Sequence, residues 1–342
     1  MPVTAGYDIG GAHLKVAIAE DGRTIAVTQI ACPLWQGLDR LDVAFAKAAH
    51  LSRRAERHAA TMTAEMCEIF PDRRTGVHTL VDRLITILGS ETRFWIGPRG
   101  FAFAEEAHQH PDCVASTNFL AAAALVGKRL GDGLLIDMGS TTTDIIPVSI
   151  GRPCPRGLND GTRLATSELV YTGLTRSDVA TVAHEVTFKG RTQRLAAGNF
   201  ATMADARRIL GELPDNADQQ DAADHRGKTL DESVARFARC LGRDSVDATH
   251  DDWSDAARDI VDQQLRAIHK ACSQVLAATP LPEDAPVVAA GIGAPLVTTL
   301  ASKLSRPCRN FGDLANATDD CRLWATRCAP AAAVALLATA EN

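Results

Sequence analysis

Two short stretches, Tyr7-Asp-Ile-Gly-Gly11 and Ile136-Asp-Met-Gly-Ser140, decide the fold of this 342-residue chain. Each contains the end of an apolar strand, an aspartate, one apolar residue, a glycine and a small residue, and a second strand-like run follows. The two aspartates, Asp8 and Asp137, lie 129 residues apart. This repeat predicts that the chain contains the same strand–turn–strand unit twice.

The segments around the two turns alternate between strand and helix patterns. We expect strands at 3–8, 13–19, 24–30, 94–97, 133–137, 144–150 and 285–290, and helices at 37–57, 75–88, 117–130 and 253–278. The length suits about two domains, which we place at 1–130 and 131–342. The second contains a helical insertion at about 160–280, with a polar, acidic loop at 214–227, and a third glycine motif at 288–295.

Composition excludes several functional classes. Lys and Arg number 36 against 42 Asp and Glu, a formal net charge of −6, so no general basic field exists to hold a nucleic acid. No apolar run is long enough to span a bilayer, and no signal peptide is recognisable at the N-terminus, so we expect a cytoplasmic protein without a membrane partner. The nine cysteines form no CxxC pair, which argues against a structural zinc or an iron–sulfur cluster.

The two repeated turns predict a phosphate site. A turn made of glycine and hydroxyl residues exposes backbone N–H groups, and such a nest accepts phosphate oxygens. An aspartate at the end of the preceding strand can hold Mg²⁺, which prefers one or two carboxylates together with phosphate oxygens and water. We therefore expect Asp8 and Asp137 to bind a divalent cation, and phosphate to rest on the backbones of Gly10, Gly11, Gly139, Ser140, Thr141 and Thr142.

Further polar residues surround this predicted site. Lys15 on the first hairpin could add a positive charge, and Asp144 after the second turn could orient the waters of the metal. The bend at Gly291 and Gly293 precedes a helix and would form a third wall. His13 could touch phosphate or simply pack.

The three motifs in this order resemble the two phosphate motifs and the adenosine motif of the actin/Hsp70/sugar-kinase superfamily. The middle of the chain is similar to the hydantoinase/oxoprolinase-like branch of that superfamily, in segments at 60–67, 70–73, 116–119, 160–164 and 168–173. The resemblance covers essentially the whole chain. It implies an α/β fold of duplicated ribonuclease-H-like domains around a central cleft.

Within this branch, the chain is most similar to short stand-alone proteins linked to tetrahydromethanopterin-dependent one-carbon transfer, a group that includes synthases of methanofuran (methylofuran) biosynthesis. That resemblance implies a transferase that joins the phenol of glutamyl-tyramine, or a related tyramine unit, to an aminomethyl-furan-methyl diphosphate and releases pyrophosphate. Mg²⁺ and Lys15 would stabilise the leaving group. The general base would be Glu65, Asp160 or Glu168, which lie in the resembling segments, and one of these could instead pair with the substrate's aminomethyl cation.

Alternatives remain at this point. Arg163 suits phosphate or carboxylate recognition, or an ion pair with Asp160 or Glu168. An ATP-dependent small-molecule kinase of the same fold is the first rival function, although the Gly-Ile-Gly-Ala-Pro295 bend lacks the paired glycines of many nucleotide-binding relatives. A non-catalytic nucleotide-binding or assembly protein is the third candidate function, after the synthase and the kinase. We expect small-molecule substrates and, from the habit of the superfamily, a homodimer.

Overall fold

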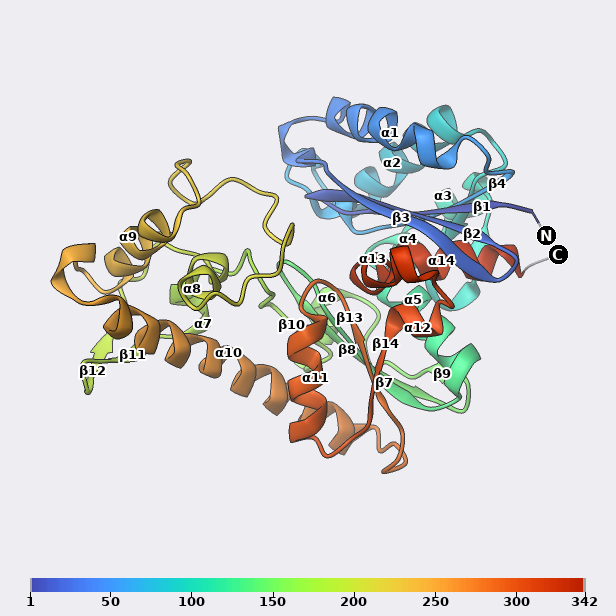
Figure 1. The fold of residues 1–342 in the computed structure, drawn as a ribbon. Coiled ribbons are helices and arrows are strands. Elements are labelled where there is room, and N and C mark those ends of the chain that lie inside the picture. Colours follow the sequence, from blue (N-terminus) through green and yellow to red (C-terminus); the bar gives the residue numbers. More distant parts are fainter. Residues whose placement is uncertain (1, 341–342) are drawn as a thin grey trace.

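The first repeat builds one sheet of the molecule (Figure 1). The computed structural model describes residues 2–340. The sheet has the strand order β3-β2-β1-β4-β5-β6, with β1–β2 and β2–β3 antiparallel and β1–β4 and β4–β5 parallel. Its strands are β1 (Thr4–Ile9), β2 (His13–Glu20), β3 (Arg23–Ala31), β4 (Arg57–Met62), β5 (Arg93–Trp95) and β6 (Phe101–Ala102).

The second repeat builds a sheet with the same topology. Its order is β10-β8-β7-β13-β14, with β7–β8 and β8–β10 antiparallel and β7–β13 and β13–β14 parallel, while β9 pairs with β8 off this path. The strands are β7 (Gly133–Met138), β8 (Thr143–Ser149), β9 (Arg152–Pro153), β10 (Leu169–Val170), β13 (Val287–Ala290) and β14 (Cys308–Asn310). The duplicated α/β fold expected from the sequence is confirmed.

Two alanine-rich helices cross between the halves. Helix α5 (Asn118–Leu130) packs on β7, β8 and β9 of the second sheet, whereas α14 (Ala329–Thr339) packs on β1, β2 and β4 of the first sheet and against α5. Small side chains let these helices approach the sheets closely, and their alanines form one buried cluster with residues of both sheets. The division at residue 130 stays a prediction, and the packing shows that each half borrows a helix from the other side of it.

Other helices cover the outer faces or extend from the second half. Helices α1 (Asp39–Ser52), α2 (Arg73–Leu88), α3 (Ala104–Gln109) and α4 (Pro111–Val114) belong to the first half. The first predicted helix, expected to run to residue 57, therefore ends at Ser52; residues 53–56 form a turn, and Arg57 begins strand β4. Around the second sheet lie α6 (Asp160–Ala165), α11 (Ala294–Lys303), α12 (Phe311–Leu314) and α13 (Arg322–Arg327).

The helical insertion forms an arm beside the second sheet (Figure 1). It contains α7 (Val179–Val182), α8 (Met203–Ile209), α9 (Leu230–Cys240), the long α10 (His250–Ala278) and a hairpin of β11 (Glu185–Phe188) and β12 (Arg191–Arg194). Between α8 and α9, the predicted loop at 214–227 returns to the first half, where Gln219 meets Gln29 and Gln220 donates to the carbonyl of Ala12. No helix within residues 2–340 combines the length and hydrophobicity needed to cross a membrane.

Candidate active site

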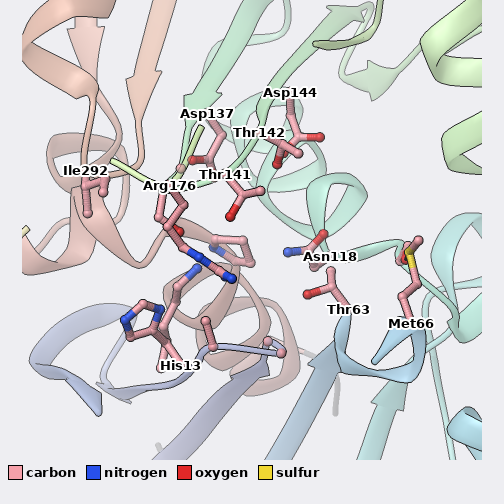
Figure 2. A pocket seen from close by; sticks show the side chains of 18 of the residues that line it. His13, Thr63, Met66, Asn118, Asp137, Thr141, Thr142, Asp144, Arg176 and Ile292 are labelled. Carbon is pink, nitrogen blue, oxygen red and sulfur yellow. The ribbon is translucent and has the colours of Figure 1, made fainter. Parts of the chain in front are cut away.

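A cleft of about 580 Å³ contains both repeated turns (Figure 2). Most of the residues singled out in the sequence line it: Gly10, Gly11, His13, Lys15, Asp137, Gly139, Ser140, Thr141, Thr142, Asp144, Asp160 and Arg163. Five others do not reach its wall: Asp8, Glu65, Glu168, Gly291 and Gly293. The chain therefore gathers one site from turns that are far apart in sequence.

The two turns are closed by the same hydrogen bond. In the first, the N–H of Gly10 donates to the carbonyl of His13 at 3.0 Å, and in the second the N–H of Gly139 donates to the carbonyl of Thr142 at 2.9 Å. Each turn thus joins its two antiparallel strands through four residues, which explains why small residues occupy both.

In each turn, a backbone carbonyl is already used as a hydrogen-bond acceptor within the protein. The carbonyl of Gly11 accepts from the N–H of Leu34 at 3.0 Å, and that of Ser140 accepts from the N–H of Arg176 at 2.8 Å. Within residues 2–340, the N–H groups of Gly11, Ala12, Ser140 and Thr141 donate no hydrogen bond. Unused N–H groups of this kind are donors for an anion such as phosphate.

In the first half, the aspartate of the repeat is neutralised within the protein. Asp8 and Lys15 are cross-strand neighbours, and Lys15 Nζ donates to Asp8 Oδ2 at 3.0 Å. Asn118 Nδ2 donates to the other carboxylate oxygen at 3.4 Å. Burial by itself would lower the pKa of Lys15, but the charge of Asp8, with a smaller contribution from Asp137, raises that pKa above its ordinary value. Lys15 is therefore a fixed positive charge on the cleft wall.

In the second half, the corresponding pair consists of two carboxylates. Asp137 is the cross-strand neighbour of Asp144. Burial, followed by the negative charge of Asp144, raises the pKa of Asp137 to about 7, although Lys15 acts in the opposite direction. A cation bound here would relieve this cost, because it would favour the ionised carboxylate.

Arg163 forms an ion pair, as one of the two alternatives from the sequence expected. Its partner is Asp144, and not Asp160 or Glu168. Its Nη2 donates to Asp144 Oδ1 at 2.5 Å and to the backbone carbonyl of Glu168 at 3.2 Å. The guanidinium lies over the ring of Phe119 at 3.6 Å from the centroid and is almost fully buried. Arg163 therefore fixes Asp144 against α5 at the edge of the cleft.

Among the three proposed bases, Asp160 is the one that faces the cleft. It lies in the first turn of α6, and burial raises its pKa, while Arg73 at 3.5 Å opposes that shift. Its carboxylate is thus accessible to a substrate and more basic than an ordinary aspartate.

The two glutamates are held behind the wall. The carboxylate of Glu168 accepts the N–H groups of Arg156 at 2.6 Å and Gly157 at 3.0 Å, which ties down the preceding loop. Glu65 accepts the hydroxyl of Ser116 at 2.6 Å, and burial raises its pKa. Their roles as bases stay predictions, and the structure gives Glu168 in particular a clear structural task.

His13 contributes an uncharged ring to the cleft. Burial, then the charges of Lys15 and Arg176, lower its pKa to about 3. Its Nε2 lies 3.3 Å from the side-chain nitrogen of Gln220 in the loop at 214–227. At neutral pH, His13 can accept or donate one hydrogen bond but adds no charge.

The third glycine motif supports the second turn from behind. Gly291 has a φ of +80°, and a Cβ there would lie 2.2 Å from the carbonyl oxygen of Met138 and 2.4 Å from Asp137 Oδ1. The N–H of Gly293 donates to the same carbonyl at 2.9 Å. Of this bend, Ile292 lines the cleft.

Sequence reasoning missed several cleft residues, among them Trp35, Asn118, Arg176 and Arg327. Asn118 lies in one of the segments that carry the family resemblance, so a signal for it existed. Arg176 and Arg327 sit outside any recognised motif, and Trp35 belongs to a single 3₁₀ turn.

The carboxylates fit a magnesium ion that is shared with phosphate. Within residues 2–340, no group of three or more His, Cys, Asp and Glu side chains is arranged to hold a metal by itself. Asp137 with Asp144 beside it supplies the one or two carboxylates that Mg²⁺ uses when phosphate oxygens and waters complete its shell. Asp8 is already engaged by Lys15.

The sequence of the chain is similar to those of known proteins. The hydantoinase/oxoprolinase family model matches residues 56–310. A Methanocaldococcus jannaschii protein named (4-{4-[2-(gamma-L-glutamylamino)ethyl]phenoxymethyl}furan-2-yl)methanamine synthase is 29% identical over 266 residues, which cover 78% of this chain and 79% of that protein. A Methanococcus vannielii protein of the same name is 30% identical over 111 residues, 32% of this chain and 50% of that one.

Solved structures confirm the fold. A nucleotide-free structure of acetone carboxylase, from a study of ATP-dependent acetone carboxylation, superposes with a TM-score of 0.56 at 10% identity. The superposition covers 89% of this chain and 68% of that one.

Proposed function

The chain belongs to the hydantoinase/oxoprolinase family, and on that premise we propose that it is a synthase that joins a tyramine-type phenol to a furan-methyl diphosphate. The product is an aryl ether, and pyrophosphate leaves. The observation that carries this proposal is the pair of matched turns, whose unused N–H groups and flanking charges surround one cleft. Such a site suits a substrate with two linked phosphates.

The substrates are proposed from the relatives. The name of the Methanocaldococcus jannaschii enzyme describes a phenoxymethyl ether between a γ-glutamyl-aminoethyl phenol and an aminomethyl furan. Phenol oxygen and furan CH₂ are the two atoms joined in that ether, so a diphosphate on the CH₂ gives a leaving group that the turns can bind. We assign glutamyl-tyramine as acceptor and aminomethyl-furan-methyl diphosphate as donor.

The reaction proceeds by transfer of the CH₂ group. The bond between the CH₂ carbon and the diphosphate oxygen breaks, and its electron pair stays with the diphosphate. The electron-rich furan stabilises positive charge on the carbon, the phenol oxygen attacks it, and the phenol proton passes to a base. In this proposal, Lys15 and the N–H groups of both turns bind the leaving diphosphate and stabilise the negative charge that develops on it, which lowers the barrier.

Asp137 would hold Mg²⁺, with Asp144 orienting its waters and Asp8 fixing Lys15 in place. When bound, the ion neutralises charge on the diphosphate. Asp160 is our choice of base, because it faces the cleft and its pKa is raised.

A phosphorus NMR time course tests the proposal. One tube contains purified protein, Mg²⁺, the furan-methyl diphosphate and glutamyl-tyramine, and a second contains ATP in place of the diphosphate. We expect pyrophosphate to appear in the first tube in step with the ether, measured by mass spectrometry. ADP formed in the second tube with no ether in the first would replace the synthase with a kinase. The control is a tube without the phenol, in which pyrophosphate release should be slow.

A further inference from the structure

One arginine at the cleft, Arg176, keeps its guanidinium N–H donors free within residues 2–340. Arg176 lines the cleft, and within residues 2–340 its side chain makes no ion pair and donates no hydrogen bond. An exposed arginine pointing into a site of this kind is a ready donor for an anion.

The backbone of Arg176 is anchored to the second turn. Its N–H donates to the carbonyl of Ser140 at 2.8 Å, beside the N–H of Thr175, which donates to the same atom at 3.2 Å. These bonds occupy a carbonyl of the turn and leave the N–H groups of Ser140 and Thr141 unused within residues 2–340. The position of Arg176 is therefore set by the same element that would bind phosphate.

The side chain of Arg176 crosses to the first half. Figure 2 shows it extending from the second turn toward His13, and its charge contributes to the lowered pKa of that residue. The guanidinium carbon lies 5.4 Å from the ring centroid of Trp35, which follows β3. Trp35 is 38% exposed, so this contact lies at the mouth of the cleft.

We propose that Arg176, resting on Trp35, binds the diphosphate from the mouth of the cleft and stabilises it as it leaves. Contact with the ring uses the face of the guanidinium, while its N–H donors lie in the plane of the group and stay free for two phosphate oxygens. When the CH₂–oxygen bond breaks, the electron pair goes to a diphosphate oxygen, and a second fixed cation beside Lys15 lowers the cost of that charge. This inference rests on the proposed function.

Arg163 shows why Arg176 is the better candidate for this role. Both guanidinium groups lie over aromatic rings at the cleft. Arg163 is buried and its charge is satisfied by Asp144 at 2.5 Å, whereas Arg176 has no carboxylate partner among the described residues 2–340. The protein thus leaves one arginine available to a ligand.

Binding of inorganic pyrophosphate tests the inference without requiring turnover. Calorimetric titration with Mg²⁺ present should give a Kd that Arg176→Gln weakens about 10- to 100-fold and Arg176→Lys weakens less, because lysine keeps the charge but loses the fork. Trp35→Leu should weaken it about threefold. The matched control is Arg243→Gln, since Arg243 also lies over a ring, that of Phe188 at 4.9 Å, but on the insertion.

The pyrophosphate titration separates the role of Arg176 from the proposed synthase activity. Pyrophosphate binding that is equal in wild type and Arg176→Gln, or absent from wild type, would overturn the role of Arg176. Binding that depends on Arg176 in a protein that makes no ether would leave this anion site in place and reject the proposed synthase. In an active enzyme, Arg176→Gln should also lower kcat with either glutamyl-tyramine or tyramine as acceptor, by similar factors, because the contact is to the leaving group.

Discussion

The two halves share a topology but differ in charge at equivalent places. In the first, the aspartate at the end of the central strand faces Lys15 across the hairpin, and the resulting pair is neutral. In the second, the aspartate at the same place faces Asp144, and Arg163 compensates only that second carboxylate. The two halves therefore share the turns that we propose to bind phosphate, but they differ in their charged side chains: the first half supplies a cation, and the second is the one that we propose to receive one.

The largest expected effect is on the reaction rate and comes from removing the carboxylate of Asp137. Asp137→Asn should lower the rate of pyrophosphate release about 10³-fold, because the position proposed to hold the metal is lost. The fold should be intact, since Asp137 makes no ion pair within residues 2–340 that the change would break, and urea unfolding checks this.

Asp8→Asn is the matched variant in the first half. It removes one carboxylate from the equivalent strand position, and we expect a smaller loss of rate because Lys15 keeps its charge and, in our proposal, Asp8 positions Lys15 but does not hold the metal. Equal losses in the two variants would show that the halves play the same part, and a wild-type rate in Asp137→Asn would reject the assignment of the metal.

The second effect concerns stability in the first half. Lys15→Met leaves Asp8, whose side chain is 2% exposed, without its cation. An uncompensated buried charge is strongly unfavourable, so we expect the free energy of unfolding to fall by about 3 kcal/mol. The measurement is urea unfolding monitored by circular dichroism.

The double variant Lys15→Met/Asp8→Asn separates charge from packing. It removes both charges, so it should recover most of the lost stability while activity stays low. If the double variant is as unstable as Lys15→Met, the loss of stability comes from the packing of the lysine side chain. Charge compensation by Lys15 would then not distinguish the first half from the second.

The repeated turns could be predicted from sequence because their information is local. An aspartate, a glycine and small residues between two strands specify a hairpin, and strands β1, β2, β3, β7 and β8 lie where the pattern placed them. Strand β4 could not be predicted, since Arg57-His-Ala-Ala-Thr-Met62 has a single β-branched residue, Thr61, and forms a strand through its parallel pairing with β1 and β5.

Much of the site could not be predicted, because it depends on contacts between residues that are far apart in the sequence. Nothing local indicates that α14 packs on the first sheet, that Arg163 pairs with Asp144, or that the loop residue Arg176 reaches the cleft. The glutamates of the family segments were likewise identified by type and position, whereas their burial, which separates them from Asp160, is a property of the folded chain.

The third expected effect concerns the bend behind the second turn. In the first half, Thr63 follows β4 at the equivalent place. Gly291→Ala would place a Cβ 2.2 Å from the carbonyl oxygen of Met138, at a φ of +80°. Gly131→Ala is the matched control, because its φ is +81° and no atom lies within 4 Å of the added Cβ. We expect Gly291→Ala to be less stable than Gly131→Ala by about 2 kcal/mol in thermal or urea unfolding. Equal stabilities would mean that the bend yields easily and does not fix the second turn.

The smallest effect is a pH dependence that belongs to the second half. The pKa of Asp137 is about 7 in the folded protein, against about 3.9 for an unperturbed aspartate. Between these values the folded state holds a proton that the unfolded state has released, so this contribution to stability is fully present below about pH 4 and is lost as the pH rises through 7. Near pH 5 to 6 the free energy of unfolding should fall by about 1.4 kcal/mol per pH unit relative to Asp137→Asn. Urea unfolding of both proteins at pH 5 and pH 6 measures this, since other titrating groups cancel in the difference. An equal change in unfolding free energy for the two proteins would show that the charge of Asp137 is neutralised as fully as that of Asp8. The two halves would then not differ in charge compensation.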